Sequence, residues 1–143
     1  MQPVPGSLTI ESHGLPGSLS GTDANGNSVP LTIGQVASDA LGVGATSSTL
    51  IIDASCYAGA RGMDVSAGRI VSPAAQQISA ALGANFQVFG NGARTNITPG
   101  VSTWQTAQAV VTSNGLISLQ PIVWRGFVGG TSFLTGSQLN PIH

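Results

Sequence analysis

The sequence predicts an α/β fold, an α/β sandwich with a mostly parallel sheet and an antiparallel hairpin toward the C-terminus. Two helical patterns, at 32–41 and 72–83, lie between short apolar strand-like runs. Helices that alternate with strands are typical of parallel crossovers, which place both strands in one sheet. An Asn-Gly dipeptide at 114–115 separates two later strand-like runs and predicts the hairpin.

The composition fits one domain that carries little charge. The chain has 143 residues, of which 6% are charged, whereas about 25% is usual in a soluble domain. Ser, Thr, Asn and Gln must therefore provide most of the solubility. The four arginines are scattered and lysine is absent, so the clustered basic surface expected of a nucleic-acid-binding protein is missing.

The N-terminal residues and the cysteine content exclude further classes. The first residues lack the basic region and long apolar run of a signal peptide, and no stretch approaches the length of a membrane span. The single cysteine, Cys56, excludes an intrachain disulfide and a multi-cysteine metal site. We therefore expect a soluble chain with one free thiol.

The first third of the chain predicts a linker end, a strand, a hairpin and a helix. Residues 1–6 contain two prolines and a glycine, which forbid regular strand pairing. Residues 7–12 predict a strand that delivers His13 to a glycine turn, and a second Asn-Gly dipeptide predicts a surface hairpin over 18–30. Thr32, with glutamine three residues later, matches a capping box and opens a helix to about residue 41.

The middle of the chain predicts a second strand and a second helix. The strand, at about 49–54, ends just before Cys56 and is followed by a glycine-bearing loop over 57–71. Ser72 as N-cap, with proline after it, starts the second helix. Gly83 ends that helix.

The last third predicts the antiparallel part of the fold. A strand at 86–89 is followed by two hairpin arms, at 104–113 and 116–124. The domain therefore spans residues 7–128, and residues 129–143 are expected to form an irregular tail.

Cys56 and His13 are the side chains on which a reaction can be built, because each follows a short strand and precedes small residues. If the helix over 32–41 is a crossover, both emerge at one sheet edge, where open α/β sheets place reacting groups. A histidine can activate a thiol by taking its proton or by ion pairing. The backbone N–H groups of Gly14 and Cys56 would then stabilise an oxyanion. The sequence predicts a His/Cys dyad whose members lie 43 positions apart.

Two motifs carry a family resemblance, each following an apolar strand: Ser12-His13-Gly14-x-Pro16-Gly17 and Asp53-Ala54-Ser55-Cys56-x-x-Gly59. Their pairing resembles the caspase-like (clan CD) cysteine peptidases, and within them the short bacterial domains found on large secreted proteins and polymorphic toxins. The stretches that resemble those domains in order are 31–32, 50–56, 75–84 and 85–89. The resemblance covers about residues 8–92.

The resemblance implies a caspase-like αβα sandwich and a cysteine endopeptidase with His13 as general base or imidazolium partner and Cys56 as nucleophile. It also implies an oxyanion hole formed by the amides of Gly14 and Cys56, a protein or peptide substrate, and no metal or organic cofactor. The domain would be an effector or toxin module of a bacterial protein that is secreted or delivered into a target cell. An immunity protein or a chaperone would then be a further partner.

Two other functions stay open at this point. A non-catalytic binding or assembly module of a large secreted protein would fit the charge-poor composition, rich in Gly, Ser and Thr. A cysteine acyltransferase or other thiol hydrolase would use the same dyad on a non-protein acyl group.

Other residues have simpler interpretations. Asp53 is an accessory candidate that either orients the base or caps a turn, and the turn is the commoner role. Arg61 and Asp64 are best explained as solvated loop charges. Trp104 and Trp124 are expected to form a pair across the predicted C-terminal hairpin.

Overall fold

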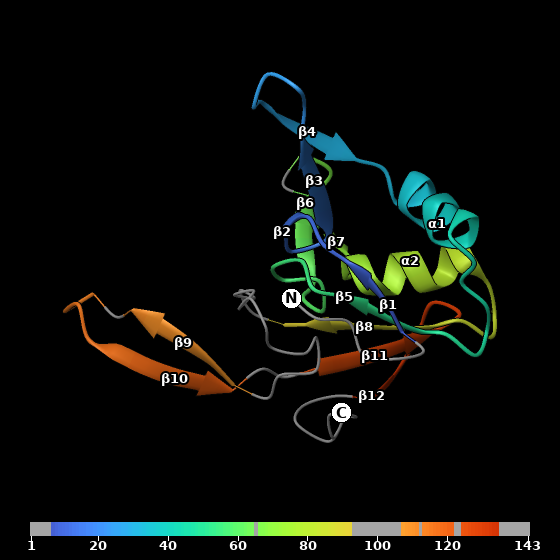
Figure 1. The fold of residues 1–143 in the computed structure, drawn as a ribbon. Coiled ribbons are helices and arrows are strands. Elements are labelled where there is room, and N and C mark those ends of the chain that lie inside the picture. The colour runs from blue at the N-terminus through green and yellow to red at the C-terminus, as the bar shows by residue number, and fades with distance from the viewer. Residues whose placement is uncertain (1–6, 65, 93–106, 112, 122–123, 135–143) are drawn as a thin grey trace.

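The structure, a computed structural model, describes residues 7–64, 66–92, 107–111, 113–121 and 124–134. Its centre is a five-stranded mixed sheet (Figure 1) with the strand order β1 (Ser7–Ile10), β5 (Leu50–Asp53), β8 (Gln87–Asn91), β11 (Trp124–Val128) and β12 (Thr131–Leu134). β1, β5 and β8 run parallel, whereas β11 and β12 pair antiparallel. The predicted α/β class with parallel strand pairs is therefore confirmed.

Two helices, α1 (Ile33–Gly42) and α2 (Ala74–Leu82), lie side by side on one face of this sheet (Figure 1). α1 belongs to the connection from β1 to β5, and α2 to the connection from β5 to β8. Ile51 on β5, Val88 on β8 and Phe127 on β11 are buried in one cluster with alanines of both helices. The helical crossovers predicted from the sequence thus build the core.

The second face of the sheet is covered as well. Ile52, Phe89 and Trp124 alternate with the helix-facing residues, and each is at most 2% exposed. Apolar burial on both faces is typical of sheets with parallel strands at their centre. Both described helices nevertheless lie on one face, so within the described residues the helices form a single layer.

The start of α1 follows the sequence closely. Thr32 is the N-cap, and its hydroxyl oxygen accepts a hydrogen bond from the Gln35 N–H at 3.2 Å. The Gln35 side chain does not return to the cap as in a full capping box, because it donates to Asp39 one turn later at 2.7 Å. The helix includes Gly42 and ends at the C-cap residue Val43.

Replacing Thr32 with alanine should lower the free energy of unfolding by about 1 kcal/mol, because the first turn of α1 loses its only side-chain cap. Urea denaturation followed by circular dichroism measures the change. Ser38→Ala, on the exposed side of the same helix, should leave stability unchanged or raise it slightly. Equal stability of the two variants would contradict the capping role.

α2 begins one residue later than the sequence predicts. Pro73 occupies the N-cap position without a side-chain cap, and the carbonyl of Ser72 accepts a hydrogen bond from the Gln77 side chain at 2.7 Å. Gly83, with φ 124°, ends the helix as predicted. Neither helix of the described ranges is long and apolar enough to cross a membrane.

Two small β-structures follow the carboxyl ends of β1 and β5. An antiparallel sheet consists of β2 (His13–Leu15), β3 (Ser18–Thr22) and β4 (Ser28–Leu31). A hairpin consists of β6 (Gly62–Asp64) and β7 (Arg69–Val71). The predicted hairpin over 18–30 is therefore confirmed as β3 and β4, whereas the predicted loop over 57–71 contains a hairpin of its own.

The C-terminal part agrees with the prediction in one hairpin and differs beyond it. β9 (Ala107–Val111) and β10 (Ile117–Pro121) pair antiparallel, as predicted, and extend away from the central sheet (Figure 1). Trp124 does not belong to this hairpin, because it opens β11 and is buried opposite Asn91. Its expected partner Trp104 lies outside the described residues, as do residues 1–6.

The predicted irregular tail contains a strand. Residues 131–134 form β12, which pairs with β11 after a tight turn. Gly129 and Gly130 in this turn have φ values of 56° and 88°, a conformation that glycine adopts without strain. Gly129 and Gly130 therefore form a tight reversal between β11 and β12.

Candidate active site

The strands that precede the two candidate catalytic residues are direct neighbours, as the crossover predicted. β1 and β5 pair in parallel, with Ile10 opposite Asp53. The Ala54 N–H extends this pairing by donating to the Ile10 carbonyl at 2.9 Å. Both chain segments therefore leave the sheet at the same edge, the first toward His13 and the second toward Cys56.

Gly14 lies directly against the backbone of Cys56. A Cβ atom added at Gly14 would overlap the Cys56 carbonyl oxygen and would lie 3.2 Å from the Cys56 nitrogen. The neighbouring atoms are main-chain atoms, which cannot rotate away as a side chain would. Only glycine fits this position, and the predicted meeting of the two segments is confirmed at the level of the backbone.

A hydrogen bond between two serines ties the same segments together. Ser12 and Ser55, the residues immediately before His13 and Cys56, approach each other with 2.8 Å between their hydroxyl oxygens. Ser55 is fully buried. The Ser12 hydroxyl also lies 3.1 Å from the His13 carbonyl oxygen, to which it can donate. Both serines stand in the two motifs that carry the family resemblance, where the sequence alone gave neither of them a role of its own.

Cys56 is carried by a turn that is fixed to the core. The Gly59 N–H donates to the Asn91 carbonyl at 2.8 Å, and the Ala75 N–H at the start of α2 donates to the Ala58 carbonyl at 2.9 Å. Tyr57 has φ 59°, an uncommon value for a residue with a side chain and one that often occurs at functional sites. The partly buried Cys56 thus projects from a backbone held by β8 and α2.

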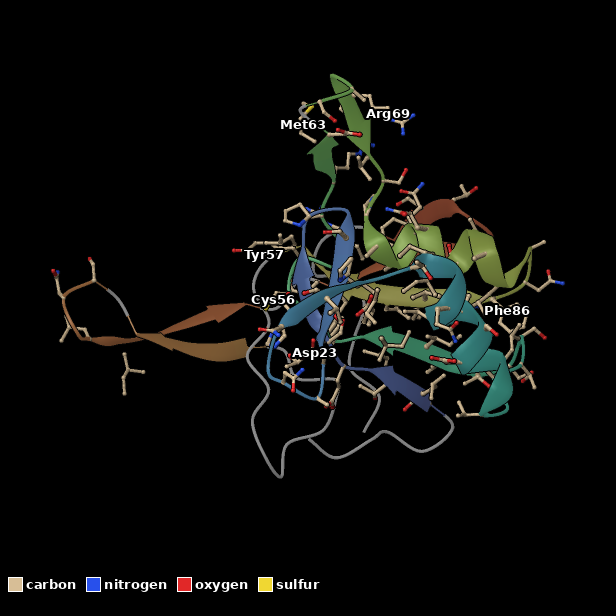
Figure 2. All side chains as sticks on the ribbon, turned by 90° about the horizontal axis from the view of Figure 1, so that it is seen from above. Asp23, Cys56, Tyr57, Met63, Arg69 and Phe86 are labelled. Carbon is tan, nitrogen blue, oxygen red and sulfur yellow. The ribbon has the colours of Figure 1, made fainter. Side chains whose placement is uncertain are left out.

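Figure 2 shows where this turn lies in the molecule. Cys56 and Tyr57 lie at one end of the central strands, beside the sheet formed by β2, β3 and β4. Phe86, which precedes β8, lies at the opposite end. The site is therefore at the carboxyl edge of the parallel strands, where the sequence analysis placed it.

His13 occupies a different element from the one predicted. The sequence predicted a strand over 7–12 that delivers histidine to a turn, whereas β1 ends at Ile10 and His13 opens β2. The reason is the tight turn at Pro16-Gly17, where Gly17 has φ 82° and which pairs 13–15 with 18–20. Proline followed by glycine is the sequence pattern of such a turn.

The alternation of side chains in β2 sets the direction of His13. Successive side chains of a strand leave on opposite faces, and the Cβ direction of Gly14 points at Cys56. The side chain of His13 therefore leaves β2 on the other face, where it is exposed. The two segments therefore meet through their backbones, and the imidazole leaves β2 on the face away from Cys56.

The pairing of β2 also directs the Gly14 N–H. Leu15 and Ser18 flank a two-residue turn and form the first pair of the hairpin, which is a hydrogen-bonded pair in such turns. The next pair back, Gly14 with Leu19, is then of the other kind, whose N–H groups point out of the ladder. The N–H of Gly14 thus points toward the outer edge of β2.

Asp53 caps the turn that leads to Cys56. One carboxylate oxygen, Oδ1, accepts the Ser55 N–H at 3.0 Å, which is the turn role favoured by the sequence. The residue is fully buried, and Oδ2 has no hydrogen-bond partner. Burial raises the pKa of Asp53 to about 6, although the Ser55 side chain and N–H counteract this by hydrogen bonding to the carboxylate.

The two other charged residues singled out from the loop have separate surroundings. Arg61 lines a cavity of about 430 Å³ together with Arg125, Gln76 and Ser132. Arg125 donates from Nη1 to the Gly59 carbonyl at 3.1 Å. Asp64 caps the β6–β7 turn, where hydrogen bonds from Ser66 and Ala67 lower its pKa.

Comparisons with known proteins add no relative. No protein-family model, no curated protein and no solved structure matches this chain. Among the described residues, no group of three or more His, Cys, Asp or Glu side chains is placed to hold a metal ion.

Proposed function

We propose that this chain is a cysteine endopeptidase domain in which Cys56 is the nucleophile and His13 its proton acceptor. The observation that carries the proposal is the packing of Gly14 against the Cys56 backbone, because it brings a His-Gly segment and a cysteine together from neighbouring parallel strands. The caspase-like αβα sandwich belongs to the proposal. The mixed sheet with its parallel crossovers supports the α/β class, and among the described residues the helices cover one of the two sheet faces.

The chemistry would be acyl transfer to the thiol. The Cys56 thiolate attacks the carbonyl carbon of the scissile peptide bond, and the Gly14 and Cys56 amides hydrogen-bond the resulting oxyanion. His13 takes the thiol proton and returns it to the leaving amine. Water then hydrolyses the thioester and restores the thiol.

The biological setting is proposed from the resemblance of the motifs to short bacterial peptidase domains. In that setting the domain is an effector or toxin module of a secreted bacterial protein, which acts on a protein or peptide. An immunity protein or chaperone is the expected further partner.

The proposal is tested by proteolysis of peptide libraries and whole-cell extracts with Cys56→Ala and His13→Ala. We expect each variant to lose activity by about 10³-fold or more, because each removes one member of a unit that acts together. His143→Ala, at the only other histidine, is the matched control and should keep full activity. Full activity in either dyad variant would overturn the assignment.

Thiol alkylation separates the proposal from its rivals. In a dyad, Cys56 should react quickly with iodoacetamide near neutral pH, because the thiolate is the reactive form. Reaction only on unfolding would support a non-catalytic binding module. Mass spectrometry of a trapped acyl-enzyme would reveal an acyltransferase if the bound group is not a peptide.

A further inference from the structure

The cavity between the Cys56 turn, α2 and β11 concentrates positive charge in a chain that carries little charge. Arg61 and Arg125 both line it, although the whole chain has only four arginines and no lysine. Its volume of about 430 Å³ is typical of a pocket for a small molecule. The other described residues that line it are uncharged, so the cavity holds two positive charges and no negative one from its described wall.

The acidic side chains of the protein lie elsewhere. The chain has five Asp and Glu residues, all within the described ranges, and none of them lines this cavity. Asp53 is buried at the end of β5, and Asp23 and Asp64 cap the turns of two hairpins. Glu11 and Asp39 line a separate cavity beside α1. Because like charges in one cavity repel each other, a bound anion would stabilise this arrangement.

The guanidinium of Arg125 is held in place at the wall of the cavity. Its Nη1 donates to the Gly59 carbonyl at 3.1 Å. On its other side, a Cβ atom added at Gly92 would lie 3.0 Å from the Arg125 Cζ atom, so the guanidinium packs closely against this glycine. A guanidinium has five N–H donors, of which the bond to Gly59 uses one. Arg125 is therefore a positioned group that can still donate to a ligand.

The number of charges in the cavity favours a phosphate group as the ligand. A guanidinium can form paired hydrogen bonds with the oxygens of either a carboxylate or a phosphate. A carboxylate carries one negative charge and would leave one guanidinium unmatched, whereas a phosphate monoester carries about 1.5 to 2 negative charges at pH 7. The wall also includes the Ser132 hydroxyl, which can donate a further hydrogen bond, and the apolar residues Pro73 and Phe127.

We propose that this cavity binds a phosphate group, either free or carried by a small organic molecule, between Arg61 and Arg125. The inference goes beyond the proposed peptidase and does not depend on it, because binding requires no catalysis. The site is nevertheless connected to the Cys56 turn, since Arg125 holds the carbonyl of Gly59 and Arg61 follows two residues later. A bound phosphate would therefore join this turn to β11 through two guanidiniums.

Isothermal titration calorimetry of the full chain with three probes tests the proposal. The probes are inorganic phosphate, phenyl phosphate and phenyl sulfate, compared at pH 7.5 and at one ionic strength because salt screens charge interactions. Phenyl sulfate has nearly the same shape as phenyl phosphate but only one negative charge, and we expect it to bind about 10-fold more weakly or worse. Tighter binding of phenyl phosphate than of inorganic phosphate would identify an organic ester as the ligand, and the reverse would identify the free ion.

Single substitutions of equal charge locate the binding site. Arg61→Gln alters an exposed side chain and should weaken phosphate binding by about 10- to 100-fold, through the loss of a charged hydrogen-bond donor. Arg69→Gln removes the same charge from the projecting β6–β7 hairpin (Figure 2), outside the cavity, and should leave binding unchanged.

Cys56→Ala should also bind as tightly as the unsubstituted chain, which keeps this result separate from that of the peptidase tests. Three outcomes would refute the proposal: no saturable binding of either phosphate probe at millimolar concentration, equal affinity for phenyl sulfate, or an equal loss of affinity in Arg61→Gln and Arg69→Gln.

Discussion

Replacing Gly14 with alanine is expected to lower the free energy of unfolding by about 1–3 kcal/mol, because the added methyl group has no space. It would overlap the carbonyl oxygen of Cys56, and relief requires a movement of either β2 or the Cys56 turn. If the site cleaves peptides, activity should also fall by about 10²-fold, since a displacement of about 1 Å in a catalytic group has this effect. Urea denaturation and peptide hydrolysis measure the two changes.

Gly34→Ala is the matched control for this substitution. Gly34 lies in α1, and a Cβ atom added there meets nothing within 4 Å. Alanine should therefore raise stability by up to about 1 kcal/mol through its better helix propensity. Should Gly14→Ala prove as stable and as active as Gly34→Ala, the close approach to Cys56 would not be a property of the folded protein.

Asp53→Asn is expected to remove a large pH dependence of stability. Burial raises the pKa of Asp53 to about 6 in the folded protein, against 3.8 for an ordinary aspartate. A raised pKa means that the folded state binds the proton more tightly. The stability that Asp53 gains from protonation in the folded state is therefore fully present below pH 3.8, and it is lost as the pH rises through about 6. The loss amounts to about 3 kcal/mol above pH 7.

Asparagine cannot ionise, so the variant should show no such loss between pH 4 and pH 7. Denaturation midpoints at pH 4.5 and pH 7.5 give the change in stability with pH for each chain. Subtracting the change in Asp53→Asn from that of the unsubstituted chain removes the contribution of the other carboxyl groups. Asp39→Asn, at an exposed position on α1, should keep the pH dependence of the unsubstituted chain. The same pH dependence in Asp53→Asn would show that Asp53 is not buried as an ionised group at neutral pH.

The parts of the fold that could be predicted are those set by local pattern and chain direction. The hydroxyl of Thr32 and the amide of Gln35 meet because their spacing matches one helical turn. The pairing of β1 with β5 follows from the handedness of a helical crossover, which leaves few other arrangements. The same rule brought Cys56 and the His13–Gly14 segment to one edge.

The remaining features depend on register and packing, which the residue pattern does not contain. Trp124 follows a strand-like run and was assigned to the hairpin, yet its burial on β11 depends on a partner strand more than thirty residues earlier. The contact between Ser12 and Ser55 exists only in one register of β1 against β5. If β1 were shifted by one residue against β5, the two hydroxyls would no longer face each other and the hydrogen bond between them would be lost.

The turn at Pro16-Gly17 is a different case, because its signal was in the sequence. Proline followed by glycine between Leu15 and Ser18 is the pattern of a two-residue reversal. Because of this turn, His13 lies at the start of β2 and not after a strand over 7–12. The direction in which its imidazole leaves the backbone therefore differs from the predicted one.

The two halves of the candidate site belong to different sheets that share one core. Cys56 is carried by a turn hydrogen-bonded to β8 and to the first residues of α2, both of which belong to the main core. His13 belongs to a separate three-stranded sheet of short strands. Small units of this kind can open locally while the rest of a protein stays folded. Here, however, Leu19 of β3 is buried in the main core cluster, and the Gln77 side chain of α2 donates to the Gly17 carbonyl at 2.9 Å. The sheet that carries His13 is therefore held to the same core as the Cys56 turn, so a change that loosens this core is expected to disturb both halves of the candidate site together.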